Sequence, residues 1–164
     1  MATLRCYGIA FALALGLISA NARAHDDVES ACRSLVIDYA YYRDRLDADN
    51  YAAVFAKDAV LSVLGNEYSG RETIRQRLVN LLETEGKPIS RHMMSTIKII
   101  PIDANAAHGV SYVKVYVEPP NDERPVATNG YVSVGEYHDI FTRTDDGWKI
   151  ARREYKPILE PASE

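Results

Sequence analysis

The chain of 164 residues carries 47% apolar and 26% charged side chains, with a formal net charge of −4. This length suits one domain with a sizeable core, and the composition excludes a disordered chain or a protein with many membrane spans. The charge provides no electrostatic basis for binding nucleic acid or anionic membranes. The two cysteines, Cys6 and Cys32, are too few for a disulfide framework.

Residues 1–24 have the pattern of a secretory signal peptide. Arg5 precedes an apolar run from Ile9 to Ala20, and Ala22-Arg23-Ala24 then forms a small-x-small cleavage pattern. The run is shorter than the roughly 20 residues that a membrane-spanning helix needs. We therefore expect an exported, periplasmic or secreted protein that begins at or near His25 and has no membrane span after processing.

The first half of the remaining chain is predicted to be mostly helical. Apolar residues between Val28 and Leu46 recur at spacings of three, four and seven, and they cover so wide an arc that we expect the helix to be covered on two sides. Asp49 or Asn50 can cap a second, short helix. Helices are thus predicted over residues 28–46, 51–56 and 71–85, with a short strand over residues 59–64.

The second half changes to β-rich segments. Valines and polar residues alternate from Tyr112 to Val117, which is the period of a strand with two different faces. Strands are predicted over residues 90–100, 107–118, 130–144 and 148–155, followed by a loose tail over residues 157–164. Helices followed by strands predict an α+β fold, with helices on one face of a mostly antiparallel sheet. If that sheet is curved, helices on its concave side produce a cone with one open end and a pocket.

Familiar motifs for phosphate, metal or nucleophilic chemistry are absent from the sequence. There is no Gly-rich phosphate loop, no H-E-x-x-H, no G-x-S-x-G and no paired-cysteine metal site. The four histidines do not pair at a ligand spacing. We therefore expect no metal and no cofactor.

Asp44 and His92 form the best candidate pair for chemistry. Asp44 lies on the apolar arc of the first helix, where an unpaired carboxylate would be costly to bury, and His92 begins the first long strand. A carboxylate that accepts one imidazole N–H leaves the other ring nitrogen as a general base near neutral pH. Asp47 follows Asp44 by three residues and is the alternative partner. A surface aspartate and a structural histidine remain the other interpretation.

Tyrosines outnumber phenylalanines by 11 to 3, which favours sites where a buried ring also needs a hydrogen-bond partner. Tyr39, Tyr112 and Tyr137 fall on the expected cone walls, Asp139 shares a strand face with Tyr137, and Met94 shares one with His92. These residues either make cross-strand pairs or line a pocket for an oxygenated organic molecule.

Several segments in order resemble one family. The matching stretches are YAYYRDRLD at residues 39–47, YAAVFAKDAVL at 51–61, GRExIR at 70–75, RHM at 91–93, GEYHD at 135–139 and DGWKIA at 146–151. Together they resemble the SnoaL-like branch of the nuclear-transport-factor-2-like (NTF2-like) superfamily. The resemblance implies, over residues 25–156, three helices packed on a strongly curved, mostly antiparallel sheet.

The resemblance also implies a chemistry. The family contains polyketide cyclases, scytalone and bile-acid dehydratases, a hexachlorocyclohexane dehydrochlorinase, steroid isomerases and many non-enzymes. Asp44 and His92 match the aspartate–histidine pair of the dehydratases and the dehydrochlorinase, and Tyr39 matches a tyrosine of the bile-acid dehydratase type. The second pocket histidine of scytalone dehydratase is replaced by Tyr116 or Val117.

The leading hypothesis is a cofactor-independent lyase or isomerase that acts on an apolar, oxygenated or halogenated ring compound. His92 would be the base, Asp44 would orient it, and Tyr39 or Tyr137 would donate a hydrogen bond. Residues expected to contact the substrate are Met94, Tyr112, Tyr137 and Asp139. The alternatives are an exported protein that binds a small molecule in the same pocket without catalysis, and a structural oligomerisation module. Family members commonly pair through the outer sheet face, so a homo-oligomer through the sheet is a further expectation.

Overall fold

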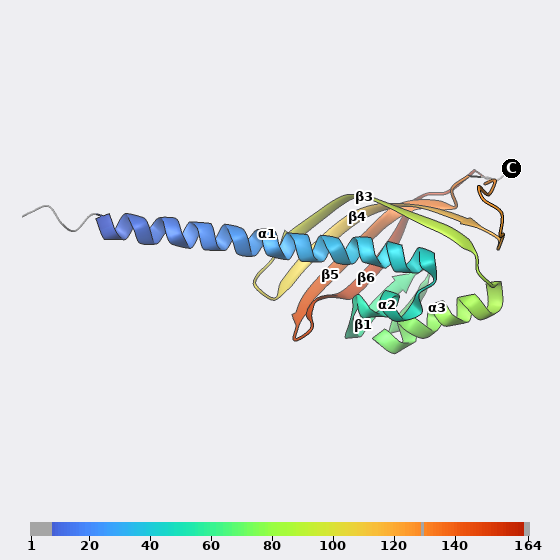
Figure 1. Ribbon diagram of the computed structural model, residues 1–164, viewed down its shortest axis with the longest axis horizontal. Coiled ribbons are helices and arrows are strands. Elements are labelled where there is room, and N and C mark those ends of the chain that lie inside the picture. Colours follow the sequence, from blue (N-terminus) through green and yellow to red (C-terminus); the bar gives the residue numbers. More distant parts are fainter. Residues whose placement is uncertain (1–7, 129, 163–164) are drawn as a thin grey trace, which may run out of the picture.

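The computed structural model describes residues 8–128 and 130–162, with side chains from residue 27 onward (Figure 1). The first seven residues of the expected signal peptide, and the side chains of the rest of it, lie outside this description. The elements in chain order are α1 (Gly8–Arg45), α2 (Ala48–Ala53), β1 (Phe55–Val63), β2 (Asn66–Ser69), α3 (Arg71–Glu85), β3 (Ile89–Pro101), β4 (Ala106–Glu118), β5 (Ser133–Thr144) and β6 (Gly147–Leu159).

The strands form one open sheet in the order β2-β1-β6-β5-β4-β3. All neighbours are antiparallel except β1 and β6, which run parallel. Strands β3 to β6 follow one another as a meander, and Gly147, with φ at 89°, closes the β5–β6 turn in the left-handed region. A mixed α+β fold with a mostly antiparallel sheet and three helices is therefore as the sequence predicts.

The three helices pack against the sheet in two groups. Helix α1 contacts β3, β4 and β6, whereas α2 and α3 contact each other and β1. Figure 1 shows α1 crossing the sheet, with its N-terminal part running on beyond the strands. In the described part of the chain, no helix combines the length and apolar composition of a membrane span.

The buried residues of α1 form a single stripe along the side of the helix that faces the sheet. They recur every three or four positions: Val28, Cys32, Val36, Tyr39, Ala40 and Arg43. Ile37, another apolar residue of the helix predicted over residues 28–46, is 49% exposed. The expectation that this helix is covered on two sides is therefore wrong, because the sheet covers one face and solvent the other.

Element boundaries differ from the prediction where long-range pairing overrides local preference. Helix α2 begins earlier than expected, because Asp47 rather than Asp49 or Asn50 is its N-cap and accepts a hydrogen bond from the Asn50 backbone N–H at 3.1 Å. Phe55 joins β1 because it pairs with Ile150 of β6. Strand β6 continues to Leu159, so the first three residues of the expected loose tail belong to the sheet.

Candidate active site

Asp44 and His92 form a closely bonded pair between the last turn of α1 and the start of β3. The Nδ1 atom of His92 lies 2.6 Å from Oδ1 of Asp44, and both side chains are 9% exposed. The His92 backbone N–H donates to Asp44 Oδ2 at 2.8 Å, and the Ser90 hydroxyl donates to Oδ1 at 2.9 Å. Asp47 caps α2 instead. Of the two aspartates that the sequence offers as partners of His92, the structure therefore pairs it with Asp44.

The hydrogen bonds around Asp44 determine the proton positions in this pair. Burial by itself would raise the pKa of Asp44, but the hydrogen bonds and charge of His92, with the Ser90 hydroxyl, outweigh it and hold that pKa below its ordinary value. Asp44 is then a carboxylate at neutral pH and can only accept. The neutral imidazole must therefore carry its proton on Nδ1, which leaves a lone pair on Nε2.

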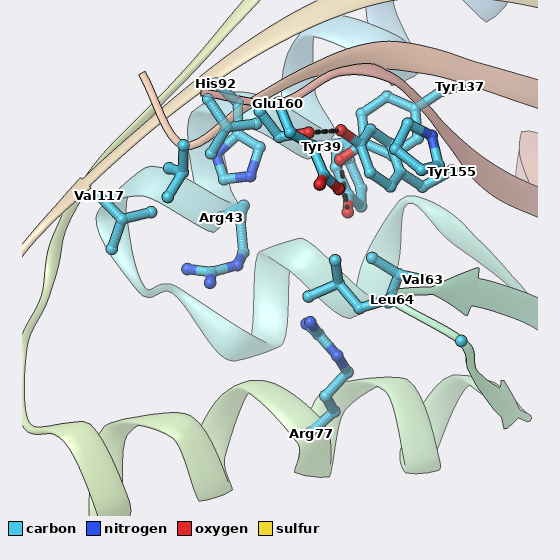
Figure 2. A pocket seen from close by; sticks show the side chains of 15 residues that line it. Tyr39, Arg43, Val63, Leu64, Arg77, His92, Val117, Tyr137, Tyr155 and Glu160 are labelled. Atoms are coloured by element: carbon cyan, nitrogen blue, oxygen red, sulfur yellow. Dashed lines mark hydrogen bonds between the residues drawn. The ribbon is translucent and has the colours of Figure 1, made fainter. Parts of the chain in front are cut away.

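A cavity of about 540 Å³ opens beside this pair (Figure 2). His92, Tyr39 and Tyr137 line it at one end, together with Tyr155 and Glu160. Ser133 also lines the cavity, and its hydroxyl is hydrogen-bonded to that of Tyr155. Much of the remaining wall is apolar and comes from β1 and the turn after it, from β4 and from the loop before β5: Val63, Leu64, Val115, Val117 and Val132. Such a volume with few polar groups is typical of a site for a small organic molecule.

Two tyrosines stand next to His92. The Tyr39 ring lies perpendicular to the His92 ring, with their centroids 6.5 Å apart, and its hydroxyl lies 3.5 Å from that of Tyr137. Burial, followed by the proximity of Tyr39, raises the pKa of Tyr137 well above its ordinary value. Tyr137 therefore keeps its proton at neutral pH and can donate a hydrogen bond to a polar group in the cavity.

A fully buried ion pair between Asp139 and Arg153 packs against the rings of Tyr39 and Tyr137. Arg153 Nε and Nη2 donate to the two Asp139 oxygens at 2.7 Å each, and neither side chain is exposed to solvent. The Arg153 guanidinium carbon lies 4.1 Å from the Tyr39 ring centroid and 4.5 Å from that of Tyr137. Asp139 therefore binds Arg153 and does not line the cavity, contrary to its expected role as a substrate contact.

Two other predicted contacts also lie off the cavity. Tyr112 is 45% exposed because β4 buries the alternate residues Ser111 and Val113, which turns Tyr112 to the outer face of the sheet. Met94 is half-buried and packs on the apolar core without lining the cavity. Of the four predicted substrate contacts, the structure thus places Tyr137 at the cavity.

Sequence reasoning missed several residues of the site. Arg43 follows Tyr39 by four positions in the buried stripe of α1, and Arg77 follows the buried Ile74 by three in α3, so helical periodicity could have found both. No periodicity in the sequence predicts that Arg153 is buried beside the cavity. The β5–β6 register shifts between Ile140 and Phe141, and this irregularity turns Arg153 inward against simple alternation.

The described residues contain no group of three His, Cys, Asp or Glu side chains arranged to hold a metal ion.

Comparison with protein families and solved structures places this fold and site in a known group. A family model described as the SnoaL-like domain matches residues 25–154. The chain belongs to the SnoaL-like family. No curated protein sequence matches the chain at a significant level.

Solved structures share the fold at low sequence identity. An NTF2-like protein with a cystatin-like fold from Novosphingobium aromaticivorans is 21% identical, with a TM-score of 0.69, over 88% of this chain and 90% of that one. A proposed scytalone dehydratase from the same organism is 23% identical, with a TM-score of 0.71, over 87% and 92%. LinA is 17% identical, with a TM-score of 0.71, over 85% and 92%.

Proposed function

We propose that the protein is a cofactor-independent lyase or isomerase in which His92 acts as a general base on an apolar ring compound. The observation that carries the proposal is the Asp44–His92 pair, because it fixes the imidazole tautomer and leaves Nε2 as the basic atom at a cavity wall. The similarity to a proposed scytalone dehydratase supports elimination chemistry for this pair.

The reaction begins when His92 Nε2 takes a proton from a carbon of the substrate. The C–H electron pair forms a double bond or an enolate, and in an elimination a hydroxyl or halide leaves from the neighbouring carbon. Asp44 stabilises the imidazolium that forms, and Tyr137 or Tyr39 donates a hydrogen bond to the leaving group or the enolate oxygen. The apolar walls limit the water that could compete for these hydrogen bonds.

Turnover and binding measured on the same ligand test this proposal. The panel contains β-hydroxy ketones and chlorinated cyclohexanes, and solvent deuterium entering the recovered compound reports proton abstraction. His92→Gln should reduce turnover by about 100-fold or more, the scale of a lost general base, with a much smaller effect on affinity. His138→Gln is the matched control, because His138 pairs with Glu136 outside the cavity.

The outcomes separate catalysis from binding. If His92→Gln leaves turnover intact, the base lies elsewhere. If no compound exchanges or is turned over, while affinity is high and falls in Tyr137→Phe, the protein is a small-molecule-binding protein that uses the same cavity.

We further propose that the protein is exported and cleaved before His25. The apolar run and the Ala22-Arg23-Ala24 pattern support this, and the family match begins at residue 25. N-terminal sequencing of natively expressed protein should give a start at or near His25, and a retained Met1 in the soluble cell fraction would contradict it.

A further inference from the structure

Two arginines line the cavity without a carboxylate partner among the described residues, and the proposed base does not explain them. Arg43 comes from α1 and Arg77 from α3, and Figure 2 shows both between the helices and the sheet, below His92. Arg43 is 9% exposed, and its Nη1 atom is buried with no hydrogen-bond partner among the described residues. A buried guanidinium N–H without a partner is costly, so this position indicates a group that is supplied from outside the chain.

The nearby acidic side chains do not neutralise these arginines. Asp44, next to Arg43 in sequence, already accepts hydrogen bonds from His92 and Ser90 on its two oxygens. Glu160 lines the cavity too, but Figure 2 shows it on the side of Tyr39 and His92, away from Arg77. Among the described residues, tyrosines act on the Arg77 guanidinium: the Tyr68 ring centroid lies 5.2 Å from the guanidinium carbon, and Tyr51 and Tyr39 also interact with its charge. This part of the cavity is therefore positively charged.

We propose that Arg43 and Arg77 bind a carboxylate carried by the ring compound, which makes an organic acid the substrate class of this site. A guanidinium presents paired N–H donors that match the two oxygens of a carboxylate. The ring then lies against apolar residues such as Leu64 and Val117, and the carboxylate anchors it with a C–H directed at His92. The inference rests on the proposed function only where it directs a substrate C–H at His92.

Equilibrium binding of matched probes tests the charge requirement without any turnover. Benzoate and 2-naphthoate are compared with benzamide and 2-naphthamide, which have the same shape but no charge, by calorimetry on the full protein. The wild type should bind at least one carboxylate about tenfold or more tightly than its amide, the scale of a hydrogen bond to a charged group. Arg43→Met and Arg77→Met should each abolish most of that preference.

Matched controls separate this effect from general loss of charge or of folding. Arg143→Met removes the same charge from an exposed position outside the cavity and should keep the preference. Without ligand, Arg43→Met should unfold at a temperature equal to or above that of the wild type, because the unpaired buried charge is gone. Addition of 2-naphthoate should then raise the unfolding temperature of the wild type more than that of the variant.

Three results would overturn the inference. They are equal binding of every carboxylate and its amide, equal losses in the cavity variants and Arg143→Met, and sulfate or phosphate competing as strongly as 2-naphthoate. His92→Gln should retain the carboxylate preference. If that preference persists while no turnover is found, the proposed catalysis fails and the acid-binding site stands; if turnover depends on His92 without the preference, the reverse holds.

Discussion

The buried Asp139–Arg153 pair allows a sharp test of how this core tolerates charge. Both side chains are fully buried, and two hydrogen bonds of 2.7 Å join them. Burial alone would lower the pKa of Arg153, but the charge and hydrogen bonds of Asp139 outweigh it and raise that pKa above its ordinary value. Arg153 therefore stays charged at any working pH. Asp139→Asn removes the compensating charge and leaves a buried cation.

The expected cost follows from that geometry. Among the described residues, Arg153 Nη1 is buried without a hydrogen-bond partner and Asp139 is the carboxylate that pairs with this guanidinium, so the variant leaves the cation without a compensating charge. Breaking such a pair from one side typically costs about 3–5 kcal/mol, whereas replacing both partners by apolar side chains is often near neutral. We expect Asp139→Asn to lose about 3–5 kcal/mol of unfolding free energy, and Asp139→Val with Arg153→Met to lose clearly less.

Urea unfolding followed by circular dichroism measures both variants against the wild type. The environment of the Tyr39 and Tyr137 rings provides a second readout, because the Arg153 guanidinium lies over both rings. The near-ultraviolet signal should therefore change in the double variant even where its stability recovers. If Asp139→Asn costs less than about 1 kcal/mol, or if the double variant is no more stable than the single one, the argument from uncompensated charge is refuted.

Two further predictions concern titrating groups. Because the pKa of Asp44 in the folded protein lies below its ordinary value, its ionised form stabilises the fold above about pH 4, and this contribution is lost as the pH falls through the lowered pKa. The unfolding free energy of the wild type should therefore exceed that of Asp44→Asn most at about pH 7, and the gap should shrink toward about pH 3; a gap that stays constant would contradict this. Burial, and then the charge of Asp139, raise the pKa of Cys32 to about 12. A chain that begins at His25 contains Cys32 but not Cys6. Ellman's reagent at about pH 8 should leave Cys32 unlabelled when this chain is folded and should label one thiol per chain after unfolding, and rapid labelling of folded protein would count against the burial of this thiol.

The periodicity of the sequence indicated Asp44 and His92 as a candidate pair, because each residue sits on a regular element, but it left Asp47 and a purely structural role open. Asp44 falls on the buried side of a helix, where a carboxylate needs a partner, and His92 lies at the start of a long strand. The fold class follows from helices followed by long alternating strands. The family follows from the resemblance of short ordered motifs over almost the whole chain after residue 24.

Tertiary structure alone decided which strand faces turn inward and which charges meet. The alternation around Tyr112 defines two faces of β4 but not which of them packs on α1, so this tyrosine was assigned to the wrong side. The Asp139–Arg153 pair depends on a register shift between β5 and β6, which no local pattern encodes. Arg43 and Arg77 meet in one cavity because α1 and α3, far apart in sequence, close it from different sides. Local sequence determines the spacing of apolar residues along each helix or strand. Contacts between the elements determine which face of each one turns inward, and the chemistry of the cavity depends on that orientation.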